Sequence, residues 1–296
     1  MELENKIYEF MKKFAVSPAG DIIIKYWGKV ENVEKQSDIK DPGSTAKTVI
    51  DEVVQELFLA DLYKIAPNVR INVEEKTTLK FLFKDNSGMV YTMIIHQDPC
   101  DGTLSYVNKT ERFSTGYAIS DKNNNFTHTV IYVPAKKTLY FASPDEFGIR
   151  RFLDGKQIEF PILEERSKRI YNKRILSEKG ITQLEKAGFY VEEVHCSHLC
   201  ILETASGLAG AFLYEKSNIH DSMIPYAFAK KCNAQLVNAN GNFVTEADMK
   251  INIENGFIKF ERLPSVCYFS ANAVKDGQMK EILGVLANKE NLNTGD

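Results

Sequence analysis

Two aspartates three residues apart stand in the segment Asp98-Pro99-Cys100-Asp101-Gly102-Thr103, which follows an apolar run. Carboxylate oxygens are the ligands that hard divalent cations prefer, and Pro99 restricts the backbone between the two aspartates. The backbone carbonyl of Cys100 offers a further oxygen ligand, and Gly102 lets backbone N–H groups approach an anion. The segment therefore predicts a turn at which a metal ion and a phosphate group share one site.

Other carboxylates stand where different elements could bring them to the same place. Glu74 directly follows residues 69–73, which are predicted to form a strand, and Asp51 and Asp221 each stand near the start of a predicted helix. A carboxylate at a helix start either caps the helix or binds a metal ion, and a segment such as 98–102 is in many proteins only a surface turn. The whole set of acidic residues, taken in order, favours a metal site over these structural alternatives.

Apolar spacing predicts the elements that position these residues. A helical period indicates helices at residues 2–27, with an interruption at Pro18 and Gly20, and at residues 49–62, 177–187, 221–232 and 273–287. Runs rich in β-branched and aromatic residues indicate strands at residues 69–73, 79–83, 90–95, 116–120, 128–133, 138–142, 189–194 and 210–214. The strands on either side of the turn signal at 85–88 predict a β-hairpin that leads to Asp98.

This order of elements predicts an α+β protein with two sheet-containing subdomains. We expect an N-terminal α+β subdomain at residues 1–165, with most of the metal ligands, and a C-terminal α/β subdomain at residues 166–296, which contributes Asp221. The boundary is set near Arg166 because residues 166–174 are basic and polar. Such a run favours a solvated linker, and binding of a nucleotide phosphate or a nucleic acid is the alternative.

The bulk composition excludes several functional classes. The 296 residues include 37 Lys and Arg and 40 Asp and Glu, so no overall positive field favours a nucleic acid polymer or an anionic membrane. The N-terminal residues 1–14 mix charges with apolar residues, and no apolar run is long enough to span a membrane, so we expect a cytoplasmic protein. Five cysteines, an odd number without framework-like spacing, indicate reduced thiols.

The motifs, in their order and spacing, resemble the Mg²⁺-dependent, lithium-sensitive phosphatases that include inositol monophosphatase and the 3'(2'),5'-bisphosphate nucleotidases. Four motifs of that family have counterparts here. They are Asp-Pro-Ile-Asp-Gly-Thr, Gly-Glu-Glu, Val-Thr-x-x-Asp with an upstream Lys, and Trp-Asp. The counterparts are Asp98 to Thr103, Val73 to Glu75, Lys47 to Asp51 with Lys40, and His220-Asp221. The second half departs from the family pattern at His220, at 223–225 and at 231–234, which bears on helix packing and substrate contacts.

The resemblance implies a ligand set for two to three Mg²⁺ ions. Glu74, Asp98 and the carbonyl of Cys100 would hold one ion. Asp98, Asp101 and Asp221 would hold a second, and a third, weaker ion would lie near Glu74. The resemblance also implies a layered αβαβα sandwich, sensitivity to lithium and, as is common in that family, a homodimer.

The resemblance implies metal-assisted hydrolysis of a small phosphorylated substrate, which is an inositol phosphate, a bisphosphate nucleotide or a sugar phosphate. Asp51 and Thr103 would orient and activate the attacking water, with Glu74 beside them as a further catalytic residue. Substrate contacts would come from Gly102, Thr103, Ser197, His198 and Glu215. The alternative from another class is a non-catalytic protein that binds a phosphorylated ligand and keeps the metal cleft.

An alternative metal site would be formed by softer ligands and would bind zinc. His195, Cys196, His198 and Cys200 are of residue types that bind zinc, but their spacing lacks the paired pattern of structural zinc sites. Packing in the protein interior is the alternative for the two cysteines. The sequence therefore favours a hard, oxygen-ligated cation.

Overall fold

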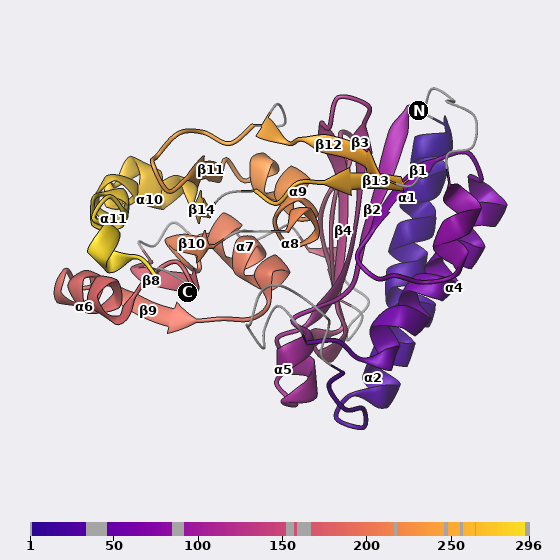
Figure 1. Cartoon of the computed structure of the whole chain (residues 1–296), viewed down its shortest axis with the longest axis horizontal. Coiled ribbons are helices and arrows are strands. Elements are labelled where there is room, and N and C mark those ends of the chain that lie inside the picture. Colours follow the sequence, from indigo (N-terminus) through magenta and orange to yellow (C-terminus); the bar gives the residue numbers. More distant parts are fainter. Residues whose placement is uncertain are drawn as a thin grey trace.

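The computed structural model describes residues 2–33, 46–84, 92–151, 157–158, 167–215, 218–245, 248–254, 257–263 and 265–293 (Figure 1). In Figure 1 the elements form five layers in the order helix, sheet, helix, sheet, helix, from the N-terminal helices on the right to the C-terminal helices on the left. The predicted α+β layered sandwich is confirmed.

Helices at the N-terminal end form the outer layer behind the first sheet. The apolar side chains on their inner face, among them Ile7, Met11 and Phe58, are fully buried in the core that they share with that sheet. The predicted interruption is confirmed at Pro18, before which Ser17 has an extended backbone with φ −148° and ψ 124°. The layer consists of α1 (Glu2–Phe14), the π-helical η1 (Ala15–Gly20), α2 (Asp21–Tyr26) and α4 (Val49–Ile65).

A seven-stranded sheet lies next, and its strands are β1 (Arg70–Val73), β2 (Met93–Asp101), β3 (Ser114–Asp121), β4 (Phe126–Val133), β5 (Thr138–Ala142), β6 (Phe147–Arg151) and β7 (Gln157–Ile158). They are arranged in chain order. β1 is parallel to β2, and every later neighbour pairs antiparallel. The strands predicted at 69–73, 116–120, 128–133 and 138–142 are confirmed, whereas the sequence pattern does not predict β6 and β7.

The predicted β-hairpin at 79–95 is wrong. Leu79–Phe83 forms a 3₁₀-helix, η2, and only the second predicted run contributes to a strand. Because β1 and β2 are adjacent and parallel, the chain between them has to cross back along the sheet, which leaves no place in the ladder for a hairpin strand. Within η2, Phe81 is 65% exposed and Phe83 is buried. The turn at 85–88 lies outside the described residues.

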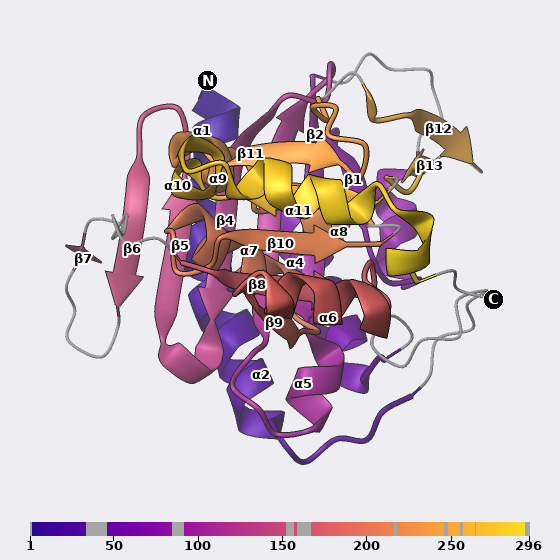
Figure 2. The same ribbon diagram turned by 90° about the vertical axis from the view of Figure 1, so that its left-hand side faces the viewer.

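Three helices, α7 (Ser197–Ala205), α8 (Ile219–Met223) and α9 (Tyr226–Lys231), lie between the two sheets (Figure 1). The second sheet consists of β8 (Arg169–Lys173), β9 (Tyr190–Glu193), β10 (Ala211–Tyr214), β11 (Gln235–Asn238) and β14 (Val266–Phe269). Its order is β11-β14-β10-β8-β9, and β14 is antiparallel to both neighbours. Figure 2 looks onto its outer face, which is covered by α6 (Glu178–Lys186), α10 (Ala271–Lys275) and α11 (Gln278–Leu286).

The basic run at 166–174 is not a solvated linker, so that prediction is wrong. Its Arg169–Lys173 part is β8, which lies between β10 and β9 and has four buried side chains. Ile170 and Tyr171 pack into different hydrophobic cores on the two faces of the sheet. This apolar pair is the signal from which the strand could have been predicted.

Two helices that the sequence predicts as continuous are each broken in two. The 221–232 segment is divided between α8 and α9 at Pro225, which caps α9 and has no N–H to donate to the preceding turn. The 273–287 segment is divided between α10 and α11 at Gly277, whose φ of +80° is in the left-handed region that favours glycine. The helix predicted at 177–187 is confirmed as α6.

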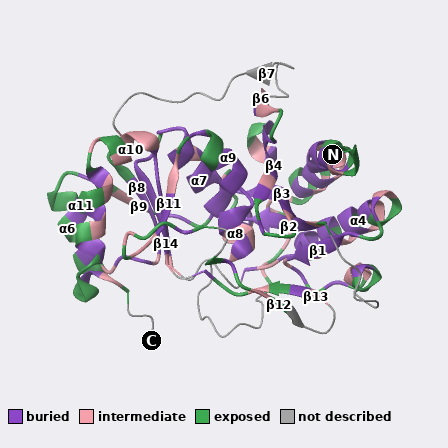
Figure 3. Ribbon diagram, turned by 90° about the horizontal axis from the view of Figure 1, so that it is seen from above, coloured by how far each residue is buried: buried purple, intermediate pink, exposed green. Residues whose placement is uncertain are grey.

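A separate two-stranded ribbon of β12 (Ile251–Glu254) and β13 (Phe257–Phe260) packs beside β1. It comes from the second half of the chain but lies against the first sheet, as Figures 1 and 3 both show. The predicted boundary near Arg166 lies outside the described residues, between the strands of the first sheet and those of the second. A division into subdomains at residues 165 and 166 stays a prediction.

Burial is concentrated on the two sheets and the helices between them (Figure 3). All five cysteines are buried and none is in a disulfide, which agrees with the predicted reduced thiols. Burial raises the pKa of every one of these thiols, that of Cys200 and Cys232 to about 12. Within the described ranges, no helix is both long and apolar enough to cross a membrane.

Candidate metal centre

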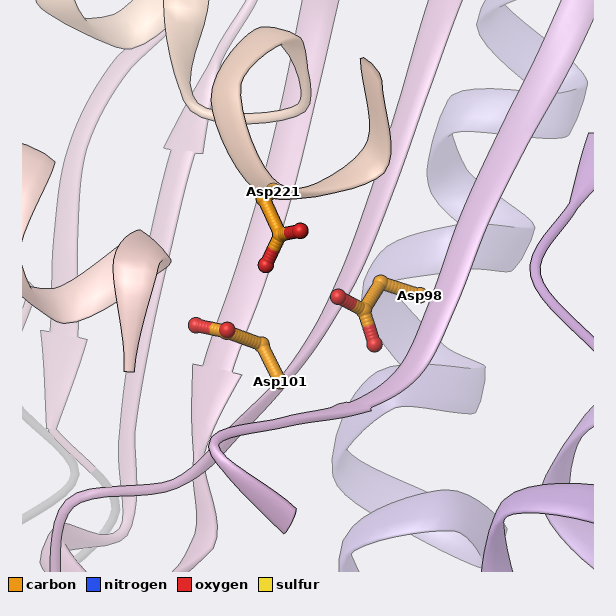
Figure 4. A group of neighbouring side chains, drawn as sticks. All are labelled: Asp98, Asp101 and Asp221. Atoms are coloured by element: carbon orange, nitrogen blue, oxygen red, sulfur yellow. The ribbon is translucent and has the colours of Figure 1, made fainter. Parts of the chain in front are cut away.

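Three aspartate side chains converge where β2 ends. Asp98 and Asp101 lie on either side of a register shift in the β2–β3 ladder, and Asp221 lies in the first turn of α8. One oxygen of each carboxylate lies within 4.8 Å of the others, and Figure 4 shows the three side chains turned toward one another. In the described ranges, this is the only such group of three or more His, Cys, Asp or Glu side chains.

The backbone between β2 and the short helix α5 (Thr103–Val107) requires a glycine. Gly102 has a φ of +83°, and a Cβ atom there would lie 2.6 Å from the carbonyl oxygen of Arg112 and 2.9 Å from Cys196 Cβ. Both the left-handed backbone and the close approach therefore exclude a larger residue. The turn also orients Asp98, whose Oδ1 accepts a hydrogen bond from the N–H of Cys100 at 3.1 Å.

The cluster holds more negative charge than its surroundings compensate. Burial raises the pKa of Asp98 well above its usual value, and the neighbouring carboxylates of Glu74, Asp101 and Asp221 raise it further. A bound cation would remove this repulsion. Because the metal-binding atoms of these carboxylates are all oxygens, they fit a hard divalent cation such as Mg²⁺.

Lys173, at the end of β8, reaches the cluster from the second sheet and is the main residue that the sequence analysis missed. Its Nζ lies 3.3 Å from Asp221 Oδ1 and donates a hydrogen bond to Ser197 Oγ at 2.7 Å. Tyr214 donates its hydroxyl hydrogen to Asp221 Oδ2 at 2.8 Å. Burial disfavours the charged form of Asp221, but Lys173 and the Tyr214 hydrogen bond outweigh it and hold the pKa of Asp221 well below its usual range.

The start of α7 holds Asp101 from the side opposite β2. Asp101 Oδ1 accepts a hydrogen bond from the N–H of Ser197 at 3.1 Å, and Oδ2 accepts from the N–H of His198 at 2.7 Å and from Cys196 Sγ at 3.0 Å. The His198 ring donates from Nε2 to the carbonyl of His220 at 3.1 Å. The side chains of Ser197 and His198 are fully buried against the carboxylates, and their predicted contact with a substrate stays a prediction.

Asp51 and Thr103 lie next to each other, although they are far apart in the sequence. Thr103 Oγ1 lies 3.3 Å from Asp51 Oδ1 and 2.8 Å from the carbonyl oxygen of Cys100, so two acceptors compete for its single hydrogen. Asp51 Oδ2 accepts from the N–H and the hydroxyl of Thr48, which forms a capping box at the start of α4. Asp51 thus caps a helix and also faces Thr103.

A small cavity of about 30 Å³ beside the cluster gathers most of the other predicted residues. It is lined by Glu74, Cys100, Gly102, Thr103 and the three aspartates, together with Ala46, Lys173, His195, Tyr214 and Asn218. Glu215, which is half-buried after the end of β10, is not among its lining residues. Lys40 lies outside the described residues.

The alternative zinc set is not assembled. Cys196 Sγ donates to Asp101, and Cys200 Sγ accepts a hydrogen bond from Arg112 Nη2 at 3.4 Å. Neither cysteine belongs to a group of three metal-binding side chains in the part of the chain that the structure describes. The thiols are used within the protein interior instead.

Sequence comparison finds a family model and two relatives that match this chain. A model of the inositol monophosphatase family matches residues 4–263. A fructose-1,6-bisphosphatase/inositol-1-monophosphatase of Thermotoga maritima is 30% identical over 139 residues, which are 47% of this chain and 47% of that protein. The 3'(2'),5'-bisphosphate nucleotidase CysQ of Haemophilus influenzae is 29% identical over 136 residues, 46% of this chain and 47% of CysQ. The matched part thus spans less than half the length of either relative.

Solved structures resemble the whole fold. The Thermotoga maritima IMPase superposes with a TM-score of 0.71 at 18% identity, covering 94% of this chain and 96% of that one. An IMPase/NADP phosphatase, solved with Mg²⁺ and phosphate, superposes with a TM-score of 0.72 at 17% identity, covering 100% and 98%. At such identities the likeness establishes the fold alone. The family model, however, covers most of the sequence, and the chain therefore belongs to the inositol monophosphatase family.

Proposed function

We propose that this chain is a Mg²⁺-dependent phosphatase of a small phosphomonoester, namely an inositol phosphate, a bisphosphate nucleotide or a sugar phosphate. The observation that carries the proposal is the convergence of Asp98, Asp101 and Asp221 close to the Thr103–Asp51 pair. Membership of the inositol monophosphatase family and the names of the two matched relatives support phosphatase chemistry.

The oxygen-rich cluster has a donor set for more than one divalent cation. Glu74, Asp98 and the Cys100 carbonyl would hold one ion, with a weaker one near Glu74. Asp101 and Asp221 would join Asp98 in holding another. When bound, Mg²⁺ supplies positive charge that stabilises the phosphoryl group in the transition state and lowers the pKa of the attacking water. The ammonium of Lys173 keeps Asp221 ionised and so ready to bind a cation.

Thr103 and Asp51 would orient and activate the attacking water. Thr103 Oγ1 accepts a hydrogen from the water, and the hydroxyl passes its own hydrogen to Asp51 Oδ1. For this, the hydroxyl has to turn away from the Cys100 carbonyl, to which it lies closer. The water oxygen forms a bond to phosphorus as the ester P–O bond breaks. The leaving oxygen takes a proton from solvent and Asp51 returns its proton to solvent, so the products are an alcohol and inorganic phosphate.

Release of inorganic phosphate tests the proposal. The chain is incubated with inositol 1-phosphate, adenosine 3',5'-bisphosphate and fructose 1,6-bisphosphate, each with Mg²⁺ and with EDTA. We expect Mg²⁺-dependent release from at least one compound, and its loss in Asp101→Asn, which removes a charged ligand with little change in volume. Asp145→Asn, an exposed aspartate outside the cluster, is the matched control.

Near wild-type turnover by Asp101→Asn at saturating Mg²⁺ would contradict the metal assignment. Binding without release would favour the non-catalytic alternative.

Lithium sensitivity is a separate prediction that rests on the family resemblance. We expect millimolar Li⁺ to inhibit phosphate release, because a small monovalent cation competes for the same hard oxygen ligands without supplying the same charge. Turnover that is unaffected by Li⁺ at both limiting and saturating Mg²⁺ would separate this chain from the lithium-sensitive members and leave the phosphatase proposal intact.

A further inference from the structure

A second, larger cavity has a volume of about 910 Å³. It is lined by η2 and the residues before it, by β13 and the residues after it, and by the start of α8. It forms because the β12–β13 ribbon, from the second half of the chain, packs beside β1 of the first sheet (Figure 3). Among the described residues, only Glu74 and Asn218 line both this cavity and the small one at the carboxylates, so the two have largely separate walls.

The larger cavity is basic. In the described part of the chain, its lining includes one carboxylate, that of Glu74, and five cationic side chains, which are Lys76, Lys80, Lys84, Lys259 and Arg262. Except for Lys259, none of these five has an ion pair with a carboxylate of the described residues. Burial and the nearby ammonium of Lys76 lower the pKa of Lys80. Positive charge that the protein itself does not neutralise favours an anionic ligand.

An open aromatic ring stands among these cations. Phe81 is 65% exposed, and its ring meets the ring of Phe257 edge-on with centroids 5.4 Å apart. Lys80 Nζ lies 5.1 Å from the centroid of the Phe257 ring, so Phe257 already serves a cation–π contact within the protein. Most of the Phe81 ring, by contrast, is free to stack on a flat group of a ligand.

The combination of cations and an open ring distinguishes between anionic partners. An acidic peptide pairs with the cations through its carboxylates and has no need of the ring. A nucleic acid duplex keeps its bases stacked inside, so it leaves the ring without a partner. A single strand presents both a phosphate backbone to the cations and unstacked bases to the ring. The cavity therefore fits a single strand best.

We infer that the basic cavity binds a short segment of single-stranded nucleic acid, with phosphates among its cationic side chains and one base against Phe81. This binding goes beyond the proposed function, because it involves no hydrolysis and does not use the carboxylate cluster. The net charge of −3 gives the chain no overall attraction for a polyanion, so the contact is local and involves few phosphates. The exclusion of nucleic acid polymers by composition applies to the overall field and not to such a local site.

Fluorescence anisotropy of labelled decathymidylate and decauridylate, in EDTA, measures this binding. We expect a micromolar dissociation constant at about 50 mM NaCl for at least one of them. The logarithm of the association constant should fall against the logarithm of the salt concentration with a slope of about −2 to −3.5, which is that of about three to five phosphates on a single strand. A hairpin duplex of the same sequence length should bind at least about tenfold more weakly, because its bases are not available to the ring.

Variants separate the charges from the ring. Lys84→Met and Arg262→Met should each weaken binding and make the salt slope shallower by about 0.7, because each removes one phosphate contact. Phe81→Ala should weaken binding by about tenfold and leave the salt slope unchanged, because a stacked base carries no charge to the contact. The matched controls are Lys186→Met, an exposed lysine on α6, and Phe243→Ala, a phenylalanine that is 64% exposed outside the cavity. If Phe81→Ala melts below wild type, Phe81→Leu takes its place, since leucine keeps the apolar bulk without the flat ring.

Three results would overturn the inference. The first is absence of binding to either oligonucleotide at low salt. The second is equal affinity of wild type and all three cavity variants. The third is equal or tighter binding of a decaglutamate peptide together with no effect of Phe81→Ala, which would assign the cavity to an acidic protein segment. Because the measurement is made in EDTA and follows binding alone, its outcome is independent of whether the chain releases phosphate.

Discussion

Lys173 and Asp221 remain charged in a place from which water is largely excluded, with side chains only 5% and 14% exposed. Each charge depends on the other, because burial alone would lower the pKa of the lysine and raise that of the aspartate. The pair also connects to Ser197 through both of its members. Lys173 is therefore a permanent cation within the acidic centre.

The first prediction concerns this lysine. Lys173→Met leaves Asp221 beside two other carboxylates without its cationic partner, so the free energy of unfolding in EDTA should fall by about 3–5 kcal/mol. Part of this loss should return with Mg²⁺ or Mn²⁺, because a divalent cation replaces the missing charge. Urea unfolding with and without metal measures both effects, with the exposed Lys122→Met as control. A variant as stable as wild type in EDTA would contradict the role of the pair.

The second prediction concerns the water-activating residues. Thr103→Val and Asp51→Asn should each lower kcat by about two to four orders of magnitude, the range of general acid–base groups. The kcat of the double variant should be close to that of the less active single variant, because the two side chains take part in the same proton transfer. Mg²⁺ affinity of Thr103→Val, measured by calorimetry, should be close to wild type. Losses of kcat that multiply would show that the residues act independently.

Strand β2 carries a buried histidine that ties three strands together. His96 Nδ1 accepts a hydrogen bond from Asn72 Nδ2 on β1 at 3.1 Å, and its Nε2 lies 2.8 Å from Ser120 Oγ on β3. Burial lowers the pKa of His96 well below 6.5, and His220 lowers it further. The ring is therefore neutral in the folded protein at pH values where the unfolded chain already binds a proton.

The third prediction follows from this pKa. Because the folded pKa lies below the unfolded value of about 6.5, the contribution of His96 to stability is complete above that pH and is lost as the pH falls toward the folded pKa. The free energy of unfolding should fall by up to about 1.4 kcal/mol per pH unit in this window. His96→Gln should flatten the profile there, as measured by urea unfolding in EDTA. Parallel profiles for variant and wild type would be inconsistent with a neutral His96.

Elements with a strong local pattern could be predicted, and those defined by their neighbours could not. α4 and β3 to β5 have clear apolar periods, and the sequence predicts their positions closely. β8 has only two apolar residues among charged and polar ones, and it is buried because β9 and β10 flank it and Asp221 accepts its lysine. Leu79–Phe83 is as apolar as a strand, yet the parallel pairing of β1 and β2 excludes it from the sheet.

The two halves of the molecule are joined by side chains on α7. Arg112, between α5 and β3, donates from Nη2 to Glu203 Oε2 at 2.9 Å and from Nη1 to Oε1 at 3.3 Å. Tyr171 of β8 donates to the same carboxylate at 2.5 Å. Asp101 accepts from two backbone N–H groups at the start of the same helix. α7 thus connects the end of the first sheet with the second sheet.

The fourth prediction tests this connection. Arg112→Met should lower the free energy of unfolding by about 2 kcal/mol, between the values for exposed and buried ion pairs, because Glu203 loses its bidentate partner. Combined with Glu203→Gln, the loss should be smaller than the sum of the two single losses, since the residues share one interaction. Urea unfolding of the four proteins gives the coupling energy. Additive losses would mean that the pair does not link the halves.

Only part of the site could be predicted from the sequence. Asp98, Asp101 and Asp221 could be predicted as one group because their motifs have a characteristic order. The surrounding contacts could not, because Lys173 and Tyr214 reach Asp221 through the packing of the second sheet. The basic cavity likewise depends on β13 lying beside β1, which no local pattern indicates.

The buried cysteines make the folded protein a poor target for alkylating reagents, which attack the thiolate at an accessible sulfur. Each hydrophobic core holds at least one of these thiols: Cys100 lies behind the first sheet, Cys200 and Cys232 between the sheets, Cys267 beyond the second sheet, and Cys196 beside α7. The rate at which each sulfur is labelled is therefore set by how frequently its own layer opens. Mass spectrometry of a labelling time course would rank the layers by their opening without any substitution in the chain.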